Sequence, residues 1–114
     1  LPSTKYTKEL INMEVFLQLK PKAMLINIGR GDTLNEVDLQ TALDKKLLRR
    51  AVLDVFCTEP LPESHPFWTH PAVIITPHIS GWHIQGWAEV VAYNYKCIKS
   101  GEPLLHEVNR AAGY

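Results

Sequence analysis

The stretch Val73-Ile74-Ile75-Thr76-Pro77-His78-Ile79-Ser80-Gly81 contains a short β-branched apolar run that stops at a proline. Such a run, bounded by turn residues, is typical of a buried strand. Because proline cannot donate to a strand ladder, we expect the strand to end there and His78 to lie in the loop that follows. In an open α/β sheet, ligands bind at the loops after the carboxyl ends of the strands. The stretch therefore predicts a strand that presents His78 to a ligand.

Two other apolar runs and three helical patterns surround this strand. Residues 24–28 and 51–56 are too short and too β-branched for helices, so we predict two more buried strands. Continuous apolar strands that alternate with helices predict an α/β fold, a doubly wound parallel sheet of three to four strands covered on both faces. The helical patterns, each with its own cap signals, cover residues 12–20, 35–47 and 83–100.

The connecting segments are rich in glycine and proline. Residues 29–32 predict a turn that only glycines allow. The prolines between residues 57 and 71 predict a loop without regular structure.

Composition narrows the class of protein. The chain has 114 residues, enough for one domain with its own core. Its 12 basic residues balance 12 acidic ones, so charge implies no nucleic acid partner. No apolar run approaches the roughly 20 residues of a membrane span, so we expect no membrane contact. Cys57 and Cys97 fit free thiols in the cytoplasm better than a disulfide. The chain begins at Leu1, and we expect that the natural protein has an earlier part.

One ionisable residue follows each of the three predicted strands. Arg30 follows the first, Glu59 the second and His78 the third. The ends of parallel strands point the same way, so these side chains can converge. A carboxylate on one imidazole nitrogen fixes the tautomer and leaves the other nitrogen for proton transfer. A guanidinium binds a substrate carboxylate, so the set suits a 2-oxo or 2-hydroxy acid, with the hydride supplied by a cofactor. Solvated turn and loop positions remain the alternative for each residue.

Asp54 stands inside an apolar strand, where an unpaired carboxylate is costly. Two interpretations stay open. The side chain either caps a backbone group at the strand end or accepts a hydrogen bond from a cofactor group such as a carboxamide.

Four motifs resemble the signatures of the D-isomer-specific 2-hydroxyacid dehydrogenases, over about residues 1–105. The resemblance is nearest to the glyoxylate and hydroxypyruvate reductase branch. It implies the second half of a Rossmann-type dinucleotide-binding domain at residues 1–105, with residues 106–114 leading toward a substrate domain. The motifs are the segment from Leu1-Pro2 through Thr7, Ile26-Asn27-Ile28-Gly29-Arg30-Gly31, Leu53-Asp54-Val55-Phe56 with Glu59-Pro60, and Thr76-Pro77-His78-Ile79.

The resemblance also implies roles for individual residues. Arg30 would bind the substrate carboxylate, His78 would act as the acid and base, and Glu59 would orient His78. Asp54 would meet the nicotinamide carboxamide of NAD or NADP. The cofactor-binding set would be Pro2, Thr7, Ile28, Gly29, Arg30, Asp54, His78, Ser80 and Gly81, with no metal.

The chain departs from the family pattern in three places. Gly29 stands where alanine is common, and Trp82 and His83 replace a run of small residues and threonine. No G-x-G-x-x-G motif occurs, so the cofactor's phosphate anchor and the residue that selects NAD or NADP would lie elsewhere. We therefore expect these 114 residues alone to be inactive, to bind cofactor poorly and to self-associate through an open sheet edge.

Other functions fit the sequence less well. Arg30-Gly31-Asp32 matches a cell-adhesion tripeptide, but a match of three residues often arises by chance. The histidine spacings match no standard metal-ligand pattern. We interpret the aromatic residues near the C-terminal helix as core and dimer surface, and we expect a homodimer. A non-catalytic module of the same fold, which binds a nucleotide or a protein without turnover, is the main alternative to the enzyme.

Overall fold

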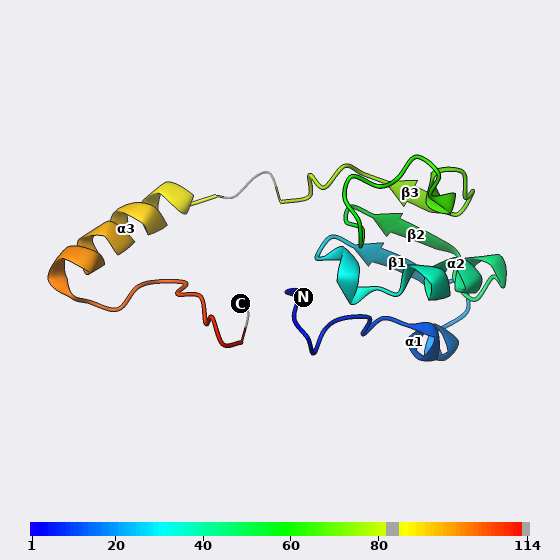
Figure 1. Ribbon diagram of the computed structural model, residues 1–114, viewed down its shortest axis with the longest axis horizontal. Coiled ribbons are helices and arrows are strands. Elements are labelled where there is room, and N and C mark those ends of the chain that lie inside the picture. Colours follow the sequence, from blue (N-terminus) through cyan, green and yellow to red (C-terminus); the bar gives the residue numbers. More distant parts are fainter. Residues whose placement is uncertain (82–84, 113–114) are drawn as a thin grey trace. The chain divides into compact units, whose positions relative to one another are not determined.

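The computed structural model describes residues 1–81 and 85–112 in two compact units, Leu1–Ser80 and Gly81–Tyr114. The first unit holds the sheet, and the second holds one long helix (Figure 1). Trp82 and His83, whose role the sequence left open, lie outside the described residues.

The sheet confirms the predicted parallel architecture. Its three strands are β1 (Met24–Asn27), β2 (Arg50–Leu53) and β3 (Val73–Ile75), all parallel, in the order β1-β2-β3. In register, Ile26 lies beside Val52, which lies beside Ile74. Each strand is shorter than predicted. β2 ends at Leu53, so Asp54 follows the strand instead of lying inside it.

Helix α2 (Glu36–Asp44) connects β1 to β2, and its first turn is built as the sequence predicts. The Asn35 side chain accepts a hydrogen bond from the Asp38 N–H, and acidic residues follow in the first turn, where the helix dipole favours them. The helix ends earlier than predicted. Lys46 has φ 57°, a left-handed conformation that cannot continue a right-handed helix.

Helix α1 (Met13–Gln18) packs against α2 and begins at the predicted cap, Asn12. It stops two residues before the predicted end, because Leu19 is already extended. The core between helices and sheet is made of large apolar side chains, all under 5% exposed: Phe16, Leu34, Leu39, Leu43, Leu53 and Phe67.

The opposite face of the sheet is not covered by residues of the first unit. Within Leu1–Ser80, Met24 and Ile26 of β1 are 53% and 56% exposed, and Ile74 of β3 is 42% exposed. Strand side chains alternate between faces, so these three residues form one apolar surface. Within Leu1–Ser80, one face of the sheet is therefore packed and the other exposes apolar side chains.

The two predicted loops each contain a short 3-10 turn. Residues Gly31–Thr33 form η1, and Gly31 is needed there for lack of space and not for its backbone angles, since neither Gly29 nor Gly31 has a positive φ. The proline-rich loop contains a second 3-10 turn, η2 (Pro66–Trp68). A proline in the first turn of a helix loses no hydrogen bond, which makes this position compatible with η2.

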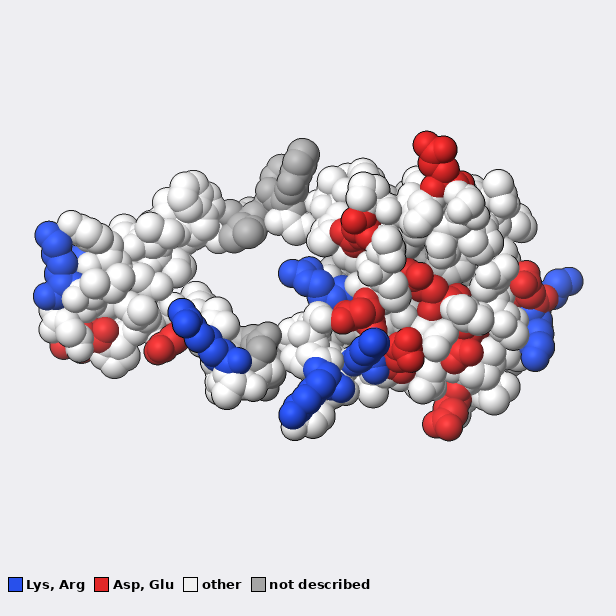
Figure 2. Space-filling view, viewed as in Figure 1, with Lys and Arg blue, Asp and Glu red and all other residues white. Residues whose placement is uncertain are grey.

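The second unit contains α3 (Trp87–Ser100). Its predicted C-cap is confirmed, since Gly101 has φ 73° and its N–H reaches the Cys97 carbonyl. The helix begins after Gly86 at φ 75°, and the predicted start at residue 83 lies outside the described residues. Among the described residues, every helix is too short or too polar to cross a bilayer. Figure 2 shows acidic groups over Leu1–Ser80 interspersed with basic ones on the face in view.

Candidate active site

The structure brings Glu59 and His78 together after β2 and β3. One Glu59 carboxylate oxygen lies 2.8 Å from Nδ1 of His78, and the other accepts the Phe56 N–H at 2.9 Å. A carboxylate can only accept, so Nδ1 carries the proton in this pair. The His78 side chain is 47% exposed, which leaves Nε2 accessible to a small molecule. The arrangement is that of a general acid and base held by a carboxylate.

The local charges keep Glu59 ionised. The hydrogen bond with His78 lowers the pKa of the Glu59 carboxyl most, and the Phe56 N–H lowers it further. Burial opposes this shift, while the charges of His78 and Arg30 add to it. Glu59 thus stays an acceptor for Nδ1 of His78 in neutral solution.

Arg30 joins this pair through its charge. Its guanidinium donates to the Gly29 carbonyl at 2.8 Å, and the side chain is exposed after β1. The predicted convergence is therefore a direct contact for Glu59 and His78, whereas Arg30 acts on Glu59 only through its charge and has its hydrogen bond to Gly29. Its predicted part in binding a substrate carboxylate stays a prediction.

Asp54 is buried and holds both flanks of His78. Its carboxylate accepts from the Thr76 hydroxyl on one side, and from the Ile79 N–H at 3.1 Å and the Ser80 N–H at 2.9 Å on the other. His78 itself has φ 54°, a left-handed conformation that costs free energy in a residue with a side chain. The Asp54 contacts fix the loop in this conformation.

These contacts also decide the charge of Asp54. Burial alone would raise its pKa, but the hydrogen bonds from Thr76, Ser80 and Ile79 outweigh burial and hold the pKa below the ordinary value. Of the two interpretations of Asp54, the structure shows the cap on backbone groups. The contact with a cofactor carboxamide stays a prediction. Thr76 was missed from the sequence, although its place just before Pro77-His78 was a usable signal.

A cavity of about 590 Å³ opens beside the Glu59–His78 pair. Its polar groups are those of Asp54, Glu59, Thr76 and His78. The rest of its wall is apolar and comes from Phe56, Leu61, Trp68 and Ile75 with two prolines. A mostly apolar hollow with a few converging polar groups is the usual form of a small-molecule site.

Four of the other predicted cofactor residues, Pro2, Thr7, Ile28 and Gly29, lie in or beside the segment that follows β1. The Thr7 hydroxyl donates to the Pro2 carbonyl at 2.7 Å and so shapes the N-terminal segment. That segment lies against Gly29, because a Cβ there would be 3.3 Å from the Leu1 nitrogen. Ile28 is 62% exposed beside them. The Ser80 N–H donates a hydrogen bond to the Asp54 carboxylate, and Gly81 belongs to the second unit. Cofactor binding by these residues stays a prediction.

The histidines of the first unit pair with three different carboxylates. His65 faces Glu36, His70 faces Asp44, and His78 faces Glu59. Within residues 1–81 and 85–112, no three histidine, cysteine or acidic side chains gather as metal ligands would. Both cysteines are free thiols.

A parallel sheet with flanking helices is the architecture of a Rossmann-type dinucleotide-binding domain, and ligands of such sheets bind at the strand ends, where Glu59 and His78 lie. Residues 1–80 match the family described as "D-isomer specific 2-hydroxyacid dehydrogenase, NAD binding domain". The chain belongs to this family. The match ends where the first compact unit ends, at Ser80. The predicted boundary at residue 105 stays a prediction.

Similar proteins include members of the glyoxylate and hydroxypyruvate reductase branch. A protein from Photorhabdus laumondii named glyoxylate/hydroxypyruvate reductase A is 46% identical over 115 residues, which is all of this chain and 37% of that protein. A crystal structure of a D-isomer-specific 2-hydroxyacid dehydrogenase from Xanthobacter autotrophicus, in complex with NADPH and MES, has a TM-score of 0.93 at 37% identity. That alignment covers all of this chain and 48% of the other.

A second solved structure is an NADPH-dependent glyoxylate/hydroxypyruvate reductase from Sinorhizobium meliloti, in complex with NADP and sulfate. Its TM-score is 0.90 at 35% identity, over all of this chain and 38% of that one. The chain thus spans less than half the length of each of these relatives.

Proposed function

We propose that this chain is the part of an NAD(P)-dependent oxidoreductase that carries its proton-transfer residues, and that the full-length protein reduces small 2-oxo acids such as glyoxylate or hydroxypyruvate to D-2-hydroxy acids. The observation that carries the proposal is the 2.8 Å contact between Glu59 and Nδ1 of His78 at the ends of parallel strands. The names of the similar proteins support the substrate class.

The residues of this chain divide the work of the reaction. Arg30 binds the substrate carboxylate through its exposed guanidinium and polarises the neighbouring carbonyl. His78 donates a proton from Nε2 to the carbonyl oxygen, or takes it back in the reverse direction. Glu59 holds the His78 ring and stabilises its charged form. The bound cofactor supplies the hydride.

An exposed apolar side chain near the strand ends supports binding of the nicotinamide end of such a cofactor. Ile28 presents an exposed apolar side chain at the end of β1, and Pro2 and Gly29 lie beside it. A carboxylate has about four acceptor sites, so Asp54 could take an amide hydrogen in addition to its three donors. The NADPH and NADP complexes of similar proteins support NAD or NADP as the cofactor.

We also propose a cytoplasmic homodimer. The two free thiols support a reducing compartment. Residues spaced by one helical turn on α3 support a protein interface, because Trp87 is 63%, Val91 60%, Tyr95 58% and Ile98 70% exposed.

A reductase assay on the full-length protein tests the proposed function. We expect oxidation of NADPH or NADH that depends on glyoxylate or hydroxypyruvate. His78→Gln should lose this activity. The matched control is His70→Gln, the same substitution at a histidine that pairs with Asp44, and it should keep the activity. A protein that binds NADPH but turns over no 2-oxo acid would instead be a non-catalytic module of this fold.

A further inference from the structure

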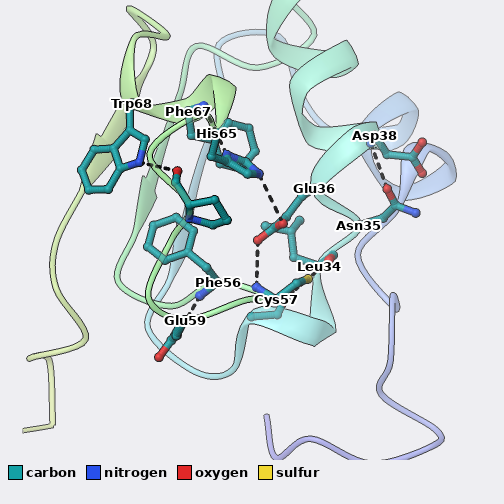
Figure 3. Close-up of polar contacts among 12 residues, drawn as sticks. Leu34, Asn35, Glu36, Asp38, Phe56, Cys57, Glu59, His65, Phe67 and Trp68 are labelled. Carbon is teal, nitrogen blue, oxygen red and sulfur yellow. Dashed lines mark hydrogen bonds and ion pairs between the residues drawn. The ribbon is translucent and has the colours of Figure 1, made fainter.

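The carboxylate of Glu36 contacts both ends of the loop that carries Glu59. Glu36 lies in the first turn of α2, and one of its oxygens accepts the Cys57 N–H at 2.9 Å. Its other oxygen lies 3.7 Å from Nε2 of His65. Figure 3 shows the carboxylate between these two partners. One side chain therefore bridges the start and the end of the loop at residues 57–65.

Each end of this loop is anchored further into the fold. The pKa of the Cys57 thiol is raised to about 11 by burial and by Glu36, so the thiol stays protonated. It lies 3.5 Å from the Gly31 carbonyl and 3.6 Å from the Leu34 carbonyl, as a weak donor would. Near the other end, Nδ1 of His65 accepts the N–H of the buried Phe67 at 3.3 Å. An accepting Nδ1 leaves the hydrogen of neutral His65 on Nε2, which faces Glu36.

Glu59 lies two residues after the first anchor. Its carboxylate reaches back to the Phe56 N–H and across to His78, so its position depends on where the loop begins. A shift of the loop moves the Glu59 carboxylate away from Nδ1 of His78. We propose that Glu36 is a positioning residue for the Glu59–His78 pair, through its contacts with Cys57 and His65. This inference rests on the proposed function for its kinetic consequence, although the contact itself can be measured without substrate.

Asp38 provides a matched control in the same helical turn. Its carboxylate accepts the Met13 N–H at 2.9 Å and so ties α2 to α1 instead of to the Glu59 loop. Both acids lie at the helix N-terminus, and each accepts one backbone hydrogen bond from another segment. Glu36→Ala and Asp38→Ala therefore cost similar stability, but only the first releases residues 57–65.

The experiment compares these variants in the full-length protein. We expect Glu36→Ala to lower kcat by about 10- to 100-fold, the usual effect of a misplaced catalytic group, with little change in KM for NADPH. We expect Asp38→Ala to keep kcat. Glu36→Gln retains an oxygen for the Cys57 N–H, but its NH2 group replaces the oxygen that faces the Nε2–H of His65. It therefore loses only the His65 contact, and its kcat should stay within about 5-fold of wild type.

The second readout is the NMR signal of the ring proton on Nδ1 of His78, assigned by its loss in His78→Gln. It should be lost or strongly shifted in Glu36→Ala, shifted slightly in Glu36→Gln and unchanged in Asp38→Ala. An unshifted signal in Glu36→Gln would overturn the proposal even if the alanine variant does not fold, and an equal change in Asp38→Ala would also overturn it. If the wild type reduces no 2-oxo acid, the proposed function fails, while this signal still decides the role of Glu36.

Discussion

Gly31 lies directly against the backbone of Phe56. A Cβ added to Gly31 would be 1.9 Å from the carbonyl carbon of Phe56, far closer than a real Cβ can come. This contact joins the segment after β1, which carries Arg30, to the segment after β2, which carries Glu59. The absence of a side chain at residue 31 thus sets the spacing between two of the three proposed catalytic residues.

Replacing Gly31 by alanine should force these two segments apart. Overpacking of this kind usually costs about 1–3 kcal/mol, and the backbone on both sides must move. Denaturant unfolding of Gly31→Ala measures the cost. Gly29→Ala is the control, since the atom nearest to its Cβ, the Leu1 nitrogen, would lie 3.3 Å away, a contact that a small shift relieves. Equal stability of the two variants would contradict this account of Gly31.

Asp54→Asn should loosen the loop that carries His78. The amide keeps one acceptor oxygen, but its NH2 group would face a backbone N–H such as that of Ser80. A buried donor without a partner costs about 1–3 kcal/mol, so the free energy of unfolding should fall by that amount. Hydrogen exchange at Ser80 should rise. Asp44→Asn is the control, because Asp44 is 61% exposed, and a loss as large in that variant would argue against a special role for Asp54.

The Glu59 carboxylate should stabilise the protein less as the solution becomes acidic. Its pKa is lowered in the folded state, chiefly by His78, so its contribution is present above the unfolded-state pKa of about 4.3 and is lost as pH falls through the folded-state value. The groups that face it are His78, the Phe56 N–H and the Arg30 charge. The difference in unfolding free energy between wild type and Glu59→Gln should therefore shrink from pH 6 toward pH 3. A difference that grows in acid would contradict the assignment.

The 114-residue chain alone should self-associate and lack reductase activity. β1 lies at an end of the strand order, and Met24 and Ile26 expose apolar side chains there. Open strand edges and apolar faces pair with other chains. Sedimentation velocity should show oligomers that Ile26→Lys shifts toward monomer. Val37→Lys, at a 75% exposed position on α2, should change nothing. A monomeric chain with measurable activity would refute the prediction.

Local patterns predicted most of the fold. The caps at Asn12, Asn35 and Gly101 depend on neighbouring residues only, and each is observed. Element lengths were less predictable because tertiary contacts end them. β2 stops before Asp54, whose carboxylate binds the loop around His78.

In the candidate site too, some contacts could be predicted from the sequence and others could not. The Glu59–His78 contact could be predicted because parallel strands end at the same edge of the sheet. The close approach of Gly31 to Phe56 and the bridge made by Glu36 join residues more than 20 positions apart. No local pattern encodes these distances, so the sequence indicated only a glycine turn and a loop without regular structure.

The most direct test of the central claim is the turnover number of His78→Gln in the full-length protein, measured with NADPH and glyoxylate or hydroxypyruvate. Loss of a general acid typically lowers the rate by about 10²- to 10⁴-fold, and we expect kcat to fall in that range while the Kd of NADPH changes little. A variant that keeps the wild-type kcat would contradict the account, because the proton would then come from a group other than the imidazole that Glu59 holds.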